Sequence, residues 1–197
     1  SPLWNKVGEH NNWFTILQNN NQIKVYFSEL DAIDSLNFEM ATMTNNLLFG
    51  VRGTLEGVLN EKAEIIVPFE CSELLLEHSN LVIKSNDGYY LLDQNGKSLI
   101  KGPFLEYYSL ETPNYLFKNK DEKWTLYDSL GNSIYINLVN PSVQKNIVKS
   151  KNNGEMTRIE LNNNGKIEEK SSFNNVVTLK VDYFVDNSKI KKNKLTR

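Results

Sequence analysis

The chain has 197 residues, with 22 lysines and arginines against 24 aspartates and glutamates. A hydrophobic share of 40% is enough to bury a core, which excludes a chain that is disordered throughout. The formal net charge of −2 lacks the positive excess that drives binding to phosphate backbones, so we expect no nucleic acid partner.

Cysteine and histidine are scarce, and their scarcity limits the chemistry of the chain. Cys71 is the only cysteine, so no internal disulfide can form, and no basic neighbour activates its thiol. His10 and His78 are the only histidines, and a zinc site would need nearly every such residue. We therefore expect no metal and no cofactor, with Cys71 in the core and His78 in a surface loop.

Targeting segments are not visible in the sequence. The longest apolar runs, such as 65–67 and 89–92, fall far short of the roughly 20 residues that cross a bilayer, so we expect no membrane span. Residues 1–4 have neither the basic region nor the apolar region of a signal peptide. The sequence therefore does not assign the protein to a cellular compartment.

Asparagine is the most unusual component, with 28 residues. Asparagine favours turns, because it tolerates positive φ and hydrogen-bonds the nearby backbone. Five related segments carry these turns: 15–22, 57–64, 90–97, 125–132 and 159–166. The three clearest lie 33 and 35 residues apart, which predicts units of about 35 residues.

The third unit shows most clearly what each repeat should form. Residues 81–84 read as a short apolar strand, and Gly88 ends a turn where positive φ is required. A second strand follows at 89–93, a second hairpin turn at 94–97, and a third strand at 98–100. The sequence thus predicts an all-β fold of about five three-stranded meanders, in a propeller-like or a solenoid-like array.

Aromatic residues recur after the third strand of the units and are interpreted as core plugs, with prolines ending the strand. They are Phe27, Phe69, Phe104 and Phe173, with Pro68 and Pro103.

The stretch at 28–44 reads as an insertion between the first and second units. Ser28 could cap a short helix with Ile33, Leu36 and Met40 on one face. Beyond Phe173, alternation over 176–185 predicts one last strand. The expected organisation is an N-terminal extension over 1–12, a single β-repeat domain over 13–186, and a basic tail or linker over 187–197.

The third unit resembles the WG-repeat family of bacterial proteins. The resemblance lies in residues 88–100 and the Gly102-Pro103-Phe104 that follows them, and residues 64–70 are similar to the segment after the Asn-Gly turn of those repeats. The aromatic-glycine pair of the family is replaced by Glu56-Gly57, Tyr89-Tyr90 and Trp124-Thr125. The resemblance implies stacked or radially arrayed β-repeats with a role in binding, and it implies no catalytic residue.

Acidic residues offer two alternatives that we weigh against simpler ones. Glu29, Asp31 and Asp34 could supply the two carboxylates of a glycosidase, although three acids on a first helical turn are simply favoured by the helix dipole. Oxygen ligands for calcium could come from Asp93, Asn95 and Asp128, but the dense alternation of a calcium loop is missing. We interpret these three as turn residues.

Aromatic side chains remain as binding candidates: Trp13, Tyr89, Tyr90, Tyr107, Tyr108 and Trp124. Adjacent strand residues point to opposite faces, so one tyrosine of each pair should be exposed. An exposed ring can anchor a protein partner or stack on a sugar.

The functional prediction is a non-enzymatic interaction module that binds a protein partner or forms a structural part of a larger assembly. Its predicted partner-binding residues are Tyr89, Tyr107, Tyr108 and Trp124, and no residue is assigned to catalysis. The alternative is a carbohydrate-binding or glycan-processing accessory domain that uses the same rings.

Overall fold

The computed structural model describes residues 5–10, 14–19, 22–33, 37–152 and 154–174, which form an all-β structure. No helix in this part of the chain is long and apolar enough to cross a membrane. The strands are β1 Asn5–His10, β2 Phe14–Asn19, β3 Gln22–Phe27, β4 Ala32–Ile33, β5 Met40–Thr44, β6 Leu47–Arg52, β7 Leu55–Asn60, β8 Ile65–Cys71, β9 Glu73–Glu77, β10 Asn80–Ser85, β11 Gly88–Leu92, β12 Glu106–Ser109, β13 Asn114–Lys118, β14 Trp124–Asp128, β15 Ser133–Leu138, β16 Ser142–Gln144, β17 Ile147–Asn152, β18 Glu155–Leu161 and β19 Ile167–Asn174.

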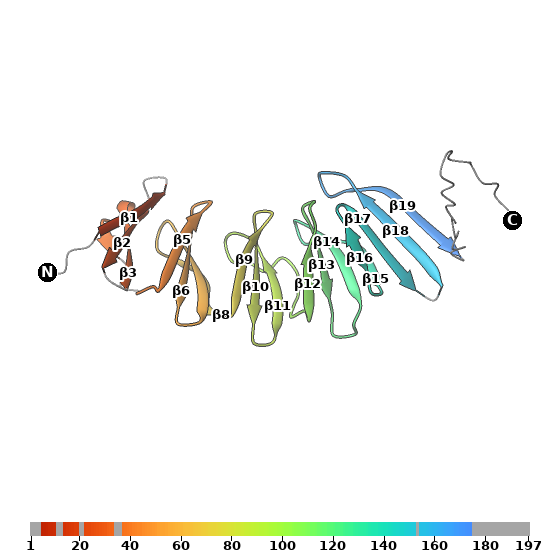
Figure 1. Cartoon of the computed structure of the whole chain (residues 1–197), viewed down its shortest axis with the longest axis horizontal. Helices are drawn as coiled ribbons and strands as arrows, with labels where there is room; N and C mark the ends of the chain where they lie inside the picture. The colour runs from red at the N-terminus through yellow and green to blue at the C-terminus, as the bar shows by residue number, and fades with distance from the viewer. Residues whose placement is uncertain (1–4, 11–13, 20–21, 34–36, 153, 175–197) are drawn as a thin grey trace, which may run out of the picture.

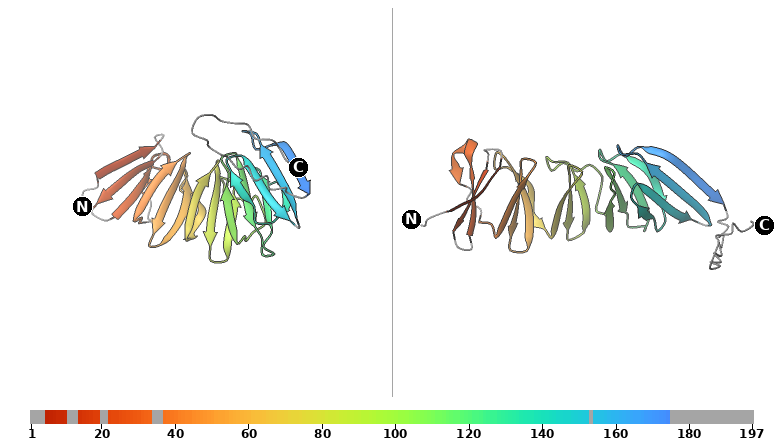
Figure 2. Two further views of the ribbon diagram at one scale, coloured as in Figure 1. Left: turned by 45° about the vertical axis from the view of Figure 1, so that its right-hand side comes forward. Right: turned by 45° about the horizontal axis from the view of Figure 1, so that its top comes forward.

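These strands form five small antiparallel sheets in which sequential strands pair. In chain order the sheets are β1–β4, β5–β8, β9–β11, β12–β15 and β16–β19, and we call them the first to fifth sheets. They lie side by side in one gently curved row, with the first and fifth sheets at opposite ends in every view (Figures 1 and 2). Local pairing of this kind requires only short connections.

Four apolar cores lie between successive sheets. From the first interface to the fourth, their buried residues are Phe14, Val25, Phe27, Phe38, Leu48 and Leu59; Leu47, Val58, Val67, Cys71, Leu74, Leu81 and Leu92; Val82, Leu91, Ile100, Phe104, Tyr115 and Phe117; and Leu110, Leu116, Leu126, Leu138, Val148, Ile159 and Leu161. Each such side chain contributes roughly 1.5–3 kcal/mol when fully buried.

The inner sheets are buried on both faces, which explains their uninterrupted apolar runs. Leu47 packs toward the third sheet, whereas its neighbour Leu48 packs toward the first. Leu81 and Val82 divide in the same way between the second and fourth sheets. Neighbouring side chains of a strand point to opposite faces, so a strand between two cores needs apolar residues at consecutive positions.

The same hydrogen-bonded turn follows the third strand in several sheets. The Oδ1 atom of Asp93 accepts hydrogen bonds of 2.9 Å from the backbone N–H groups of Asn95 and Lys97. Equivalent pairs of bonds are made by Asn60, Asp128 and Asn162. This geometry confirms that Asp93, Asn95 and Asp128 are turn residues.

These turns also contact the preceding sheet. A Cβ atom built on Gly96 would lie 2.4 Å from the carbonyl oxygen of Ile66, and one on Gly131 would lie 2.5 Å from that of Leu99. Asparagines at the start of the second strand reach forward to meet the turns: Asn80 Nδ2 donates to the Ser129 carbonyl at 2.8 Å, and Asn114 Nδ2 donates to the Gly165 carbonyl at 3.0 Å. Main-chain contacts therefore join successive sheets in addition to the apolar cores.

The helix expected around 28–44 is wrong for the described residues. Only Ser28–Leu30 form a single 3-10 turn, which ends at Asp31 with φ of 46°. Tyr26 donates a 2.8 Å hydrogen bond to the Asp31 carboxylate, and Ile33 pairs with Tyr26 in β4. Met40 lies in strand β5, where the exposed Met40 and Thr42 alternate with the partly buried Ala41 and Met43.

Other differences concern the strands themselves. Four sheets have four strands rather than three, and residues 98–100 form no strand and pair with β11 through the isolated Leu92–Ser98 bridge. Residues 5–10, which were expected in the N-terminal extension over 1–12, form β1 and pair with β2. Pro68 lies inside β8 and does not end it. The strand expected at 176–185 and the tail at 187–197 lie outside the described residues.

The predicted aromatic plugs are only partly correct. Phe27 and Phe104 are buried in the cores, and Phe69 packs against Phe38 with ring centroids 5.7 Å apart. Phe173 is 52% exposed. It lies on β19, the last strand of the fifth sheet, where no further sheet among the described residues covers it.

Candidate binding groove

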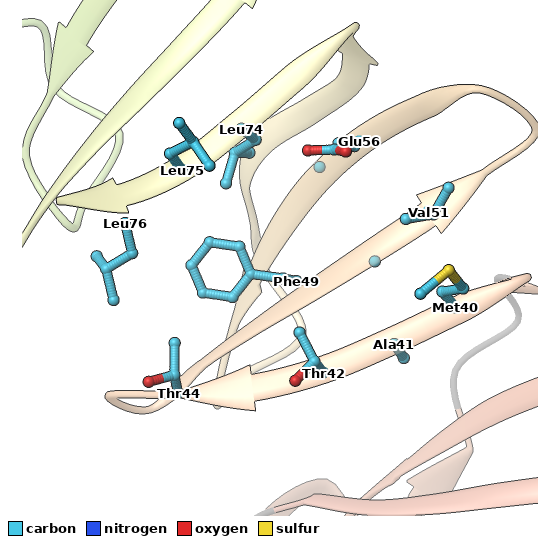
Figure 3. A pocket seen from close by; sticks show the side chains of 12 residues that line it. Met40, Ala41, Thr42, Thr44, Phe49, Val51, Glu56, Leu74, Leu75 and Leu76 are labelled. Carbon is cyan, nitrogen blue, oxygen red and sulfur yellow. The ribbon is translucent and has the colours of Figure 1, made fainter. Parts of the chain in front are cut away.

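An open groove of about 350 Å³ lies between the second and third sheets. Figure 3 shows it between β5 and β6 on one side and β9 on the other. Its side-chain lining comes from β5, β6, β7 and β9: Met40, Ala41, Thr42, Thr44, Phe49, Val51, Glu56, Leu74, Leu75 and Leu76. Most of these residues are apolar, which is typical of ligand grooves.

The register of the second sheet builds one wall of the groove. Met40 pairs with Val51, and Thr42 pairs with Phe49, so these four side chains share one face of the sheet. The Phe49 ring projects from β6 toward β9 (Figure 3). Met40 is 67% exposed, which is unusual for a methionine on a strand that faces a neighbouring sheet.

The opposite wall is β9, where Leu74 and Leu76 face the second sheet. Both β5 and β9 are first strands of their sheets, so each pairs with a neighbour along one edge only among the described strands. The groove thus combines apolar walls with two strand edges that hold backbone hydrogen-bonding groups.

Among the described residues that line the groove, Glu56 is the only charged one. Its carboxylate makes no hydrogen bond or ion pair with the described residues. Its charge reaches Cys71: burial raises the pKa of that thiol most, and the negative charges of Glu56 and Glu70 raise it further. Cys71 is buried, as expected from the sequence, and its raised pKa makes it a poor nucleophile.

The predicted binding residues do not form one site. Tyr89 and Tyr107 meet between the third and fourth sheets, with ring centroids 5.0 Å apart. Burial, with the charges of Glu77 and Glu73, raises the pKa of Tyr107 to about 12. Tyr108 is 50% exposed, and Trp124 packs against the core between the fourth and fifth sheets.

The remaining candidates have structural partners or lie outside the described residues. His78 is not a free surface histidine, because its Nε2 atom lies 2.7 Å from the Leu110 carbonyl oxygen and ties the third sheet to the fourth. The Tyr90 hydroxyl donates to the Asp87 carboxylate at 2.6 Å. Trp13 and Asp34 lie outside the described residues. No cluster of three metal-ligating side chains occurs in the described part of the chain.

Sequence reasoning missed the groove, because its residues carry no motif. Two signals were available: the run Leu74-Leu75-Leu76, and the position of Met40 in a segment that alternates like a strand. Neither reveals that two sheets separate at this point, since separation depends on the sizes of side chains from both sheets.

Comparisons with known proteins give structural likeness only. No protein-family model matches the chain, and no curated protein matches its sequence. Hsv2p of Kluyveromyces lactis is similar over 86% of this chain and 63% of its own, with 10% identity and a TM-score of 0.40. The N-terminal domain of Nup159 is similar over 71% and 45%, with 11% identity and a TM-score of 0.38.

The WD40 β-propeller domain of Doa1 is similar over 86% of this chain and 73% of its own, with 9% identity and a TM-score of 0.32. The chain spans about three fifths of the length of the Hsv2 structures that it matches. These TM-scores are low, so the architecture rests on the sheet topology and not on the likeness.

Proposed function

We propose that this chain is a non-enzymatic β-repeat interaction module that binds a protein partner in the groove between β5 and β9, alone or as part of a larger assembly. The observation that carries this proposal is the groove itself, which joins an apolar surface to two strand edges. Exposed edges are templates for adding a strand from another chain, and apolar walls select its side chains.

The proposal that the chain has no catalytic activity rests on its candidate nucleophile and base. Cys71 is buried and its pKa is raised, whereas His78 is held by Leu110 between two other sheets. A nucleophile needs a base within hydrogen-bonding reach. Cys71 lies in the core between the second and third sheets, whereas His78 contacts Tyr115 between the third and fourth sheets.

We further propose that the five sheets are copies of one unit of about 35 residues, related to the WG repeats and arrayed as an open solenoid-like row. Support comes from the turn residues Asn60, Asp93, Asp128 and Asn162, which recur at intervals of 33, 35 and 34 residues with the same two hydrogen bonds.

Site-specific photo-crosslinking tests the interaction proposal. A benzophenone amino acid replaces Met40 in the groove or, as a control, Leu130, which is 73% exposed in a turn of the fourth sheet. In cells that produce the protein, the Met40 variant should form an adduct with a distinct polypeptide, and the Leu130 variant should not. Equal adducts from both positions, or none from Met40, would contradict the proposal.

Carbohydrate binding is the second candidate, and the exposed Tyr108 ring is the feature that favours it. The Tyr89 and Tyr107 rings contact each other, which leaves less ring surface for a sugar. A glycan array separates the two functions, because an interaction module for proteins predicts no bound glycan. A positive array whose signal is lost in Tyr108→Ala would favour the carbohydrate function.

A further inference from the structure

We propose that the groove between β5 and β9 binds an extended peptide that carries an apolar side chain close to a lysine or arginine. This inference rests on the proposed interaction function and specifies the chemistry of the partner. It follows from three properties of the groove: its strand edges, its unfilled apolar space and its single carboxylate.

The strand edges determine the conformation of the ligand. β5 pairs only with β6, and β9 pairs only with β10 among the described strands. In Figure 3 the arrows of the two strands point the same way across the groove. An extended peptide laid along either edge would satisfy the free backbone groups of that strand, and alternate side chains of the peptide would face the walls.

The apolar space exists because of a difference between neighbouring interfaces. Leu74 on β9 and Tyr107 on β12 hold equivalent positions, each opposite the fourth residue of the next strand: Ile83 in β10 and Phe117 in β13. Between the third and fourth sheets the Tyr107 ring fills this position, 5.0 Å from Tyr89 and 5.9 Å from Phe117.

Between the second and third sheets the smaller Leu74 stands at that position, and it lines the groove together with the short side chains of Thr42 and Thr44. The space that an aromatic ring occupies at one interface is therefore open at the other. An aliphatic or aromatic side chain of the peptide would fill it beside Phe49.

The charge of the groove selects a cation. Glu56 is its only charged lining residue, and it has no hydrogen-bonding or ionic partner among the described residues. It lies toward the end of the groove formed by Met40 and Val51, away from Thr44 (Figure 3). An ammonium or guanidinium group of the peptide would pair with this half-buried carboxylate while its neighbour occupied the apolar space.

A randomised peptide library displayed on phage and selected against the full chain tests the inference. Enriched peptides should combine an apolar residue with a lysine or arginine at a fixed short spacing. Glu56→Gln should weaken these peptides by about five- to tenfold, because it removes the charge and keeps the shape. The matched control Glu39→Gln removes a charge from an exposed residue that does not line the groove, and should leave binding unchanged.

Two more variants test position and sign. Thr42→Trp should abolish binding by filling the groove, whereas Ser142→Trp, an exposed residue on the first strand of the fifth sheet, should not. Glu56→Lys should shift selection toward acidic peptides. Circular dichroism melts of every variant establish that the fold is retained.

The outcomes separate this inference from the proposed function. Enriched peptides without a basic residue, peptides insensitive to Glu56→Gln and Thr42→Trp, or no enrichment at all would overturn the inference. The interaction function would stand or fall separately, on whether a photo-crosslinker at Met40 captures a polypeptide.

Discussion

At the scale of single residues, one side-chain oxygen organises each of several turns between strands. Asp93 Oδ1 accepts two backbone N–H groups, and Asn60, Asn119 and Asn162 do the same with an amide oxygen. Either a carboxylate or an amide group can therefore stabilise the turn, because only its oxygen is needed as the hydrogen-bond acceptor.

Replacing Asp93 tests this role directly. Asp93→Ala should lower the free energy of unfolding by about 1–2 kcal/mol, because two backbone donors lose their acceptor. Asp93→Asn is the matched control and should change it by less than about 0.5 kcal/mol. Urea denaturation measures both values, and equal losses in the two variants would show that the charge, and not the acceptor, matters.

The ionisation of Tyr115 makes the stability of the fold depend on pH. Its hydroxyl donates to the Glu77 carbonyl at 2.5 Å, and burial raises its pKa to about 12. In the unfolded chain a tyrosine loses its proton near pH 10. The folded state therefore holds the proton more tightly, and the stability that Tyr115 contributes is present below pH 10 and is lost as the pH rises toward 12.

Tyr115→Phe should consequently have two effects on the free energy of unfolding. At pH 8 the variant should be less stable by about 1 kcal/mol, because the hydrogen bond to Glu77 is lost. Between pH 10 and 12 the variant should lose less stability than the parent chain. Urea titrations at pH 8 and pH 11 measure the difference, and parallel losses in the two proteins would refute the assignment.

At the scale of elements, the close approach of a turn to the preceding sheet explains why glycine is needed there. Gly96 has φ of 78°, and a Cβ atom would lie 2.4 Å from the Ile66 carbonyl oxygen. Gly53 has a similar φ of 65° but no atom within 4 Å of a built Cβ. A comparison of substitutions at the two glycines therefore distinguishes the cost of backbone strain from the cost of a clash between sheets.

Gly53→Ala should cost about 1–2 kcal/mol of stability, which is the strain of positive φ alone. Gly96→Ala should cost at least about 2 kcal/mol more, because the backbone of the second sheet must also move. Thermal and urea denaturation provide the comparison. Equal costs would mean that the sheets separate easily at this contact.

Element by element, the turns could be predicted from the sequence and the groove could not. Gly88, Gly96 and Gly131 have positive φ, which is a local requirement of their turns, so these turns can be predicted from the sequence of a single unit. The first strands of the sheets, β1, β5, β9, β12 and β16, escaped prediction because their pairing depends on a neighbour in the sheet. The groove is lined by residues from two sheets, such as Met40 and Leu74, which come together only once the sheets are aligned.

At the scale of the whole molecule, each of the four apolar cores of the described residues joins two neighbouring sheets of the row (Figure 1). The stability of such arrays is approximately a sum of sheet and interface contributions. Damage at one interface should therefore loosen the sheets at that end of the row and leave the other end protected.

Leu116→Ala tests this independence, because Leu116 is fully buried between the fourth and fifth sheets. The cavity should cost about 2–4 kcal/mol. Hydrogen exchange should become faster in β17 and β18 and stay unchanged in β2 and β6. Leu48→Ala at the first interface is the matched control and should give the reverse pattern, whereas uniform acceleration in both variants would show that the row unfolds as one unit.

The turn-to-sheet contacts have a consequence for how such a chain can evolve. Gly96 and Gly131 rest on the carbonyl oxygens of Ile66 and Leu99, and Asn80 donates to the carbonyl oxygen of Ser129. Main-chain oxygens are present whatever side chain a residue carries. The spacing and tilt between sheets can thus survive many side-chain replacements, so the signature of a repeat can fade from the sequence while its geometry is inherited.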